Sequence, residues 1–443
     1  MKYAKTALAI TAATLVYGCS SAEKRMVNED PYIWLESLES QDAKAWVERH
    51  NKLTRAKLEG DPRFLPLKNE IKKILAAKDR VAMPSQRGRL IRNFWQDERH
   101  VRGVWRETTF EEYVKPAPKW KILLDVDALN KAEKKSFVFS GANCLAPDYK
   151  RCLVRLSDGG KDKAIMREFD TVTRKFVTGG FELPEAKSSY DWIDRETVFL
   201  LMDTGPDSLT SSGYPRQVRI WRRGQPFKDA KLVFEGEKTD VAVSAYRNLG
   251  TATKNSFVAR YPNFFESEGY WYKDGKLIRI PIPTTAGIIG DTDEFLIFTL
   301  RFDWMVRGTT FPAGAVLSLP LTSVKDQTEP YEPEGLQAIF APSEKLAFSG
   351  LSITKSYLYL TVLNDVNGEI YRIERKAGGW ERAKLPFPAG GMPAITDAPT
   401  DSDRFFATFE SFGVPTSLYV GEGPKAHETL KLLKQLPPRF DAS

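Results

Sequence analysis

Short β-rich segments separated by polar turns fill most of this chain, and they constrain its fold more than any other feature. From about residue 85 to residue 430, runs such as "KSFVFSG", "ETVFLLMDTG" and "SYLYLTVLNDVNGEIYRIERK" alternate with Gly, Asp, Asn and Pro turns. Many of these runs form pairs joined by a polar turn, and no long amphipathic helix interrupts them. The pattern excludes a βαβ architecture and leaves a sandwich, a barrel or a propeller.

The length of the β-rich region decides among these folds, because a sandwich or a small barrel uses far fewer strands. Divided over seven blades, the region supplies about 49 residues for each blade, close to the ~40–50 residues of known propeller repeats. Six or eight blades also fit this length, since the internal repeat is weak. We therefore predict an all-β chain in which residues 81–432 form a seven-bladed β-propeller.

Two amphipathic helices are predicted ahead of the propeller, in a helical segment covering residues 20–80. The first spans residues 40–58, and one face of it carries Ala43, Trp46, Val47, His50 and Leu53. The second spans residues 66–77, and its apolar stripe consists of Leu67, Ile71, Ile74 and Leu75. Both sets follow the spacing of an amphipathic helix. The stretch "GDPRF" separates the two helices.

The first residues indicate a targeting signal rather than part of the fold. In "MKYAKTALAITAATLVYGCS" two lysines precede an apolar stretch over residues 7–16 and then Gly18 and Cys19. Residues 1–19 therefore read as a signal peptide that is too short to span a membrane. The ending "LVYGC" resembles the lipobox of bacterial lipoproteins, although Tyr17 is bulky for that position. We expect lipidation of Cys19 and a location in the cell envelope, in the periplasm or at the outer membrane, with the lipid as the only membrane attachment. Ordinary secretion with an incidental cysteine is the alternative.

Two further cysteines, Cys144 and Cys152, lie in "GANCLAPDYKRCLVRLSDGG". The stretch "APDYKR" is typical of a turn between two apolar runs, so the cysteines can face each other across a hairpin. In an oxidising compartment this arrangement predicts a disulfide. The alternative is a pair of half-buried thiols on different faces, because disulfide geometry is demanding. Two thiolates without a nearby histidine do not make a metal site, so we predict no metal and no cofactor.

Three stretches resemble a known family. "DPYIWLESLESQDAKAWVERHN" (residues 30–51) and "VRGVWRETTFEEY" (residues 101–113) are similar to the prolyl oligopeptidase family, the S9A serine peptidases. "DTGPDSLTSSGYPRQVRIWRRGQP" (residues 203–226), with the closing "LLKQLPPRFDAS", resembles a bacterial subgroup. The resemblance implies a seven-bladed propeller joined to an α/β-hydrolase domain that carries a Ser-Asp-His triad. It also implies that the propeller covers the active site and admits only short peptides. Residues 433–443 would then be a linker to a hydrolase domain that this sequence lacks.

The residues required for acyl transfer are not found in this sequence. A hydrolase nucleophile needs a G-x-S-x-G elbow, and no such pentapeptide occurs. Ser212 and Ser349 lie in β-rich surroundings, and we interpret both as turn serines. The three histidines, His50, His100 and His427, lie in no catalytic motif, and packing on the first helix is the expected role of a half-buried His50. We therefore predict no catalytic residue in this chain.

Charge and composition limit the classes of partner that this chain is expected to bind. The net charge of +7 comes from scattered basic residues, without zinc-ligand spacing, a basic helix or an aromatic-plus-glycine signature. These absences argue against a nucleic-acid partner. We expect short peptides in the propeller tunnel and a hydrolase domain or chain that acts in trans. The predicted function is a non-catalytic, substrate-gating or peptide-binding propeller of a prolyl-oligopeptidase-like serine endopeptidase. The alternatives are a truncated gene product and an envelope-anchored scaffold that binds a protein partner without any link to proteolysis.

Overall fold

The computed structural model describes residues 30–37 and 39–439, which belong to two compact units, Met1–Ala76 and Ala77–Ser443. The predicted signal peptide and Cys19 lie outside the described residues. Within the described part of the chain, no helix is long and apolar enough to cross a bilayer.

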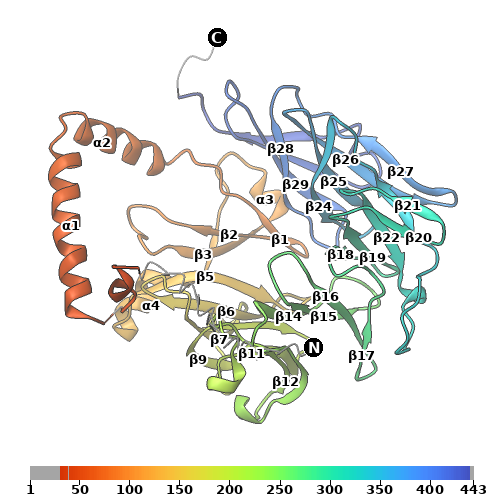
Figure 1. Cartoon of the computed structure of the whole chain (residues 1–443). Coiled ribbons are helices and arrows are strands. Elements are labelled where there is room, and N and C mark those ends of the chain that lie inside the picture. The colour runs from red at the N-terminus through yellow and green to blue at the C-terminus, as the bar shows by residue number, and fades with distance from the viewer. Residues whose placement is uncertain (1–29, 38, 440–443) are drawn as a thin grey trace, which may run out of the picture. The chain divides into compact units, whose positions relative to one another are not determined.

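The first unit contains the 3-10 turn η1 (Ile33–Glu36) and the helices α1 (Gln41–Glu59) and α2 (Phe64–Leu75) (Figure 1). Ser40 caps α1 because its Oγ accepts a hydrogen bond from the Ala43 amide at 3.4 Å. Both predicted helices are confirmed to within two residues. His50 is exposed, so the prediction that it is half-buried is wrong. Its ring stacks on Trp46 one turn earlier, with 3.7 Å between ring centroids, and packing within the helix therefore replaces burial.

The second unit is a seven-bladed β-propeller, as predicted (Figure 1). Blade 1 contains β1 (Ser85–Arg87), β2 (Leu90–Trp95), β3 (Val104–Thr109) and β4 (Lys121–Asp125). Blade 2 contains β5 (Phe137–Cys144), β6 (Arg151–Asp158), β7 (Ala164–Asp170) and β8 (Lys175–Phe176), and β9 (Glu182–Ala186) also pairs with β7. Blade 3 contains β10 (Ser188–Trp192), β11 (Thr197–Met202), β12 (Gln217–Arg222) and β13 (Lys231–Glu235). Blade 4 contains β14 (Ala242–Arg247), β15 (Ser256–Tyr261), β16 (Glu268–Lys273) and β17 (Lys276–Arg279).

The remaining three blades follow the same order. Blade 5 contains β18 (Gly287–Asp291), β19 (Phe295–Thr299), β22 (Val316–Pro320) and β23 (Gln337–Phe340), and a hairpin of β20 (Trp304–Val306) and β21 (Thr309–Phe311) interrupts it. Blade 6 contains β24 (Leu346–Ile353), β25 (Leu358–Asn364), β26 (Asn367–Lys376) and β27 (Gly379–Lys384). Blade 7 contains β28 (Met392–Asp397), β29 (Arg404–Glu410), β30 (Ser417–Glu422) and β31 (Lys431–Gln435).

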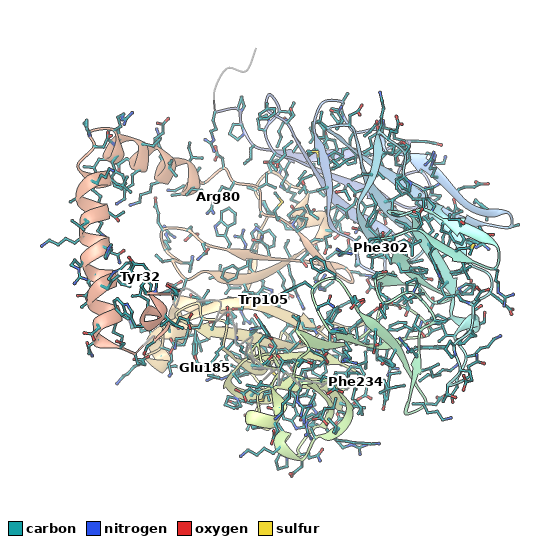
Figure 2. All side chains as sticks on the ribbon, viewed as in Figure 1. Tyr32, Arg80, Trp105, Glu185, Phe234 and Phe302 are labelled. Carbon is teal, nitrogen blue, oxygen red and sulfur yellow. A yellow bond between two sulfur atoms is a disulfide. The ribbon has the colours of Figure 1, made fainter. Side chains whose placement is uncertain are left out.

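Short helical segments fill several of the connections. They are α3 (Phe110–Tyr113), α4 (Val126–Glu133), η2 (Pro206–Ser208), η3 (Phe227–Asp229) and η4 (Leu321–Ser323). The core lies between neighbouring blades, so the middle strands bury both of their faces. This explains why β11 reads "TVFLLM" rather than as an alternating pattern. Trp105, labelled in Figure 2, belongs to such a layer, because it packs with Phe139 and Phe169 of the next blade.

The seam between blade 7 and blade 1 is held by side chains, because every blade is built from consecutive strands and none is shared. The connection after β3 carries α3 into this seam. Tyr113 is fully buried there against Phe406, and its hydroxyl donates to the Ala82 carbonyl at 2.7 Å. The Arg404 guanidinium lies 3.8 Å from the centre of the Phe110 ring.

The strand order fixes on which side the chain enters and leaves the propeller. Because a blade has four antiparallel strands, the chain enters and leaves each blade on the same side. We call this side the proximal face, and it also carries the loops between the second and third strands. The opposite side is the distal face. An ion pair of 2.5 Å between Asp79 and Arg439 ties together the segments before β1 and after β31 on the proximal face.

Candidate functional site

The candidate site is the axial channel of the propeller together with the proximal face. The first strands of the blades face this channel, because residues of β5, β10, β14 and β18 line its cavities. Three cavities follow these strands. They have volumes of about 380 Å³ between blades 4 and 5, about 340 Å³ between blades 3 and 4, and about 260 Å³ between blades 2 and 3. The first two fall within the size range of small-ligand pockets.

A loop of blade 7, residues 398–403, crosses the channel at its distal end. Asp401 accepts a hydrogen bond from the Tyr149 hydroxyl of blade 2 at 2.6 Å, and Thr400 Oγ1 lies 3.4 Å from Asn248 Oδ1 of blade 4. Neither blade is a neighbour of blade 7, so these bonds span the axis. Gly250 allows the approach, because a Cβ there would come within 1.7 Å of Thr400 Oγ1.

Buried carboxylates tie the inner strands together near the same end. Asp191 accepts bonds from Asn143 Nδ2 at 2.7 Å and from the Arg247 amide at 2.8 Å, which links blade 3 to blades 2 and 4. Asp397 accepts a bond from the Gln86 amide at 2.7 Å, which links blade 7 to blade 1. Burial raises the pKa of both carboxyls.

Asp291 makes the corresponding link between blades 5 and 4. Its carboxylate accepts bonds from the Tyr246 hydroxyl and from Asn248 Nδ2, each at 3.2 Å. Burial raises the pKa of Asp291 to about 6, and these two hydrogen bonds oppose the rise. Because the Asp291 carboxylate of blade 5 accepts hydrogen bonds from blade 4, its first role is to join these two blades.

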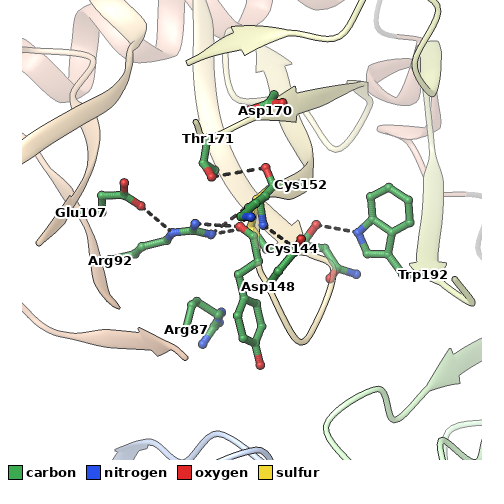
Figure 3. The surroundings of a disulfide bond; sticks show 12 residues. Arg87, Arg92, Glu107, Cys144, Asp148, Cys152, Asp170, Thr171 and Trp192 are labelled. Atoms are coloured by element: carbon green, nitrogen blue, oxygen red, sulfur yellow. Dashed lines mark hydrogen bonds and ion pairs between the residues drawn. A yellow bond between two sulfur atoms is a disulfide. The ribbon is translucent and has the colours of Figure 1, made fainter. Parts of the chain in front are cut away.

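A disulfide joins Cys144 and Cys152, which face each other as a cross-strand pair of β5 and β6 (Figure 3). The buried Arg92 lies beside it. Its Nη2 donates to the Tyr149 carbonyl at 2.8 Å, its Nη1 lies 3.0 Å from Cys144 Sγ, and its Nε pairs with Glu107 at 3.4 Å. Burial lowers the pKa of Arg92. The disulfide and Arg92 thus hold the loop that presents Tyr149 to the channel.

The structure keeps the serines and histidines considered for catalysis apart. His100 contacts Asp97 at 3.1 Å, His427 lies 3.5 Å from Glu428, and His50 contacts the Trp46 carbonyl. Within the described residues, no hydrogen bond joins a histidine to a serine.

The two serines differ in their backbone setting. Ser212 lies in a turn, as predicted, and its Oγ donates to the Val241 carbonyl at 3.2 Å. Ser349 was predicted to lie in a turn, and that prediction is wrong, because it lies within β24. It occupies a bulge between Phe348 and Gly350, which explains its irregular local pattern.

The proximal face carries large apolar side chains in the loops between second and third strands. Phe264 is 84% exposed, and these connections also carry the strongly exposed apolar residues Val101, Phe265, Phe302, Met305, Val366 and Phe412. Phe302 is labelled in Figure 2, and the Arg301 guanidinium lies 5.0 Å from the centre of the Phe265 ring in the neighbouring loop. In the loops of the distal face, Val172 is the most exposed large apolar residue that the structure describes. Clustering of this kind marks a contact surface.

Seven consecutive blades around a channel define the class of this chain as a seven-bladed β-propeller. A family model described as "Prolyl oligopeptidase, N-terminal beta-propeller domain" matches residues 21–431, so the chain belongs to the prolyl oligopeptidase family and corresponds to its N-terminal propeller domain.

Three similar proteins indicate how much of a family member this chain represents. It is 37% identical over 423 residues to the uncharacterized peptidase y4nA of Sinorhizobium fredii, covering 93% of this chain and 57% of that protein. It is 27% identical over 454 residues to the uncharacterized peptidase RP174 of Rickettsia prowazekii, covering 98% and 62%. The solved post-proline cleaving enzyme from Rickettsia typhi superposes with a TM-score of 0.84 at 27% identity, covering 92% of this chain and 60% of that one. The chain thus spans less than two thirds of each relative.

Sequence reasoning did not find the loop at residues 398–403, the buried carboxylates of the inner strands, or the two cations Arg155 and Lys187 that line the cavity between blades 3 and 4. Within the described residues, no cluster of three His, Cys, Asp or Glu side chains suits a metal ion. The only hint at the cavity was the stretch "SSGYPRQV", whose Tyr214 and Pro215 line it.

Proposed function

We propose that this chain is a non-catalytic, substrate-gating and peptide-binding module of a prolyl-oligopeptidase-like serine endopeptidase. A hydrolase domain, in the same polypeptide or in trans, would cover the proximal face and receive peptides held in the channel. The supporting observation is that both ends of the propeller leave on the face that carries Phe264, Phe265, Phe302 and Phe412. Burial of a phenylalanine side chain contributes roughly 1.5–3 kcal/mol, so covering several of them stabilises a domain contact.

The first experiment measures activity of this chain alone. We expect no turnover of a proline-containing chromogenic peptide and no labelling by a serine-directed fluorophosphonate. Turnover that survives purification and is blocked by the fluorophosphonate would contradict the non-catalytic role.

A second experiment tests the proximal face as the contact surface. The part of the Sinorhizobium fredii relative that lies beyond the matched region is expressed separately and titrated with this chain. We expect binding that falls about tenfold when Phe264 or Phe412 is changed to Ser, which corresponds to about 1.4 kcal/mol. Val172→Ser on the distal face is the matched control and should leave binding unchanged. Equal losses for all three variants would contradict the assignment.

We further propose that Cys19 carries a lipid that anchors the protein in the cell envelope. The disulfide in the propeller supports a location in an oxidising compartment. Expression in a bacterial host followed by mass spectrometry of the N-terminal peptide tests this, and Cys19→Ser should release the protein from the membrane fraction. An unmodified Cys19 in the mature protein would contradict the anchor.

A further inference from the structure

Two cations without carboxylate partners line the cavity between blades 3 and 4. The cavity has a volume of about 340 Å³, and its lining includes Arg155, which belongs to the adjoining blade 2, as well as Lys187, Ser189 and Tyr214. It lies at the proximal end of the channel, because its lining contains the first residues of the inner strands β10 and β14. It is therefore placed on the side from which the proposed hydrolase domain would exchange peptides.

Both cations are held without being neutralised. Lys187 Nζ lies 4.5 Å from the centre of the Tyr214 ring, and Arg155 Nη2 donates to the backbone carbonyl of Asp162 at 2.9 Å. Among the residues that the structure describes, neither cation forms an ion pair with a carboxylate. Arg223 and Arg260, by contrast, pair with buried acids at 2.6 Å and 2.8 Å. The charge of Arg155 and Lys187 is thus available to a ligand.

The rest of the lining indicates which ligand fits. Asp162 is the one acidic residue of the wall, so the two cations leave an excess of positive charge. A guanidinium and an ammonium in this setting suit a carboxylate or a similar oxyanion. The remaining wall is largely apolar and is formed by Leu201, Tyr214, Pro215, Ala242 and Val243. A carboxylate attached to an apolar side chain therefore fits better than a bare inorganic anion.

The neighbouring cavity extends the site. The space of about 260 Å³ between blades 2 and 3 shares Arg155, Ser188 and Ser189 with the first cavity. Because they share these residues, the two cavities adjoin, and the second one offers space for the preceding residues of an extended peptide. We propose that Arg155 and Lys187 bind the C-terminal carboxylate of an oligopeptide, while Tyr214 packs against its last side chain. This inference rests on the proposed peptide-binding function and assigns a direction to the bound peptide, whose C-terminus would lie between Arg155 of blade 2 and Lys187, which precedes the first strand of blade 3.

The test compares two peptides on the purified chain by isothermal titration calorimetry. One is an unlabelled proline-containing hexapeptide ending in leucine with a free C-terminus, and the other is its C-terminal amide. We expect the free acid to bind about tenfold more tightly, which corresponds to about 1.4 kcal/mol. Arg155→Gln and Lys187→Gln should each reduce the preference for the free acid over the amide, and the double variant should abolish it. Arg279→Gln and Lys231→Gln, on the outer strands β17 and β13, are the matched controls and should keep it.

The outcomes separate this site from the wider proposal. If the wild-type chain binds acid and amide equally, the carboxylate site is overturned while peptide binding stands. If neither peptide binds, both are overturned. Inorganic phosphate should displace the free acid only weakly; binding of phosphate without binding of the free acid would identify a small-anion site and overturn the peptide assignment. The acid–amide comparison needs no variant, so a poorly folding Arg155→Gln does not remove the test.

Discussion

The two units of this chain differ in the burial of their apolar residues. In the helical unit Ala43 is the one buried residue of α1, and Leu53, Leu67 and Ile71 are largely exposed. In the propeller Phe199, Phe298 and Phe405 are fully buried between blades. An amphipathic pattern therefore indicates that a helix has an apolar face. Whether that face is buried depends on whether the same unit supplies a surface that packs against it. The stability of the chain should reside in the propeller.

The largest effect is expected at the seam between blades 7 and 1. Phe406→Ala removes a fully buried ring that packs on Phe110 and Tyr113. We expect the free energy of unfolding to fall by about 3–5 kcal/mol. The measurement is urea unfolding followed by tryptophan fluorescence. Leu53→Ala, at a residue that is 64% exposed in α1, is the control and should change stability by less than about 0.5 kcal/mol. Equal losses of unfolding free energy in the two variants would contradict the prediction that stability resides in the propeller.

A buried ion pair of the propeller should contribute more to stability than an exposed ion pair of the helical unit. The Asp240 side chain is 1% exposed and accepts two hydrogen bonds from Arg260, at 2.8 Å and 3.0 Å. Arg260→Met leaves this buried carboxylate without its cation, and we expect a loss of about 3 kcal/mol. The exposed pair Lys44–Glu39 of the helical unit is the control, and Lys44→Met should cost less than about 0.5 kcal/mol. The double variant Arg260→Met/Asp240→Asn should recover part of the loss, and failure to recover would locate the effect elsewhere.

Titration of one buried carboxyl in the propeller and of one exposed carboxyl in the helical unit should change stability with opposite signs. The folded pKa of Asp291 is about 6, above its ordinary value, so the folded state binds the proton more tightly than the unfolded state. Stability from this group therefore falls as the pH rises from about 4 to about 6, by up to about 3 kcal/mol. Asp61 in the helical unit has a lowered pKa because of its hydrogen bonds from Arg63, so its contribution is lost as the pH falls.

The variant Asp291→Asn isolates the contribution of Asp291 to the pH dependence of stability. The variant should lose the decline between pH 4 and pH 6, measured as the difference from the wild-type unfolding free energy at each pH, because the other carboxyls are common to both proteins. A wild-type slope that persists in the variant would show that another group is responsible.

Much of the fold was predictable because it depends on local patterns. Turn spacing and apolar runs indicated the seven blades, helical periodicity indicated α1 and α2, and the turn between Cys144 and Cys152 indicated the hairpin they close. The candidate site was less predictable, because it depends on which blades face each other. Nothing local in "APTDSD" shows that Thr400 and Asp401 reach across the channel, and a period of two cannot show that Arg155 lacks an acidic partner. Ser349 was misplaced because a bulge resembles a turn in sequence.

The smallest of the predicted changes in propeller stability comes from removing the disulfide. Replacing Cys144 and Cys152 by Ser opens a loop with a sequence separation of 8, and a loop this short contributes about 2 kcal/mol. Arg92 still binds the Tyr149 carbonyl, so the loop should loosen rather than unfold. Amide exchange should therefore rise over residues 145–150 and at the Asp401 contact, while α1 and α2 keep their wild-type rates. Faster exchange in the helices would mean that the two units share their stability, and the contrast between them would then fail.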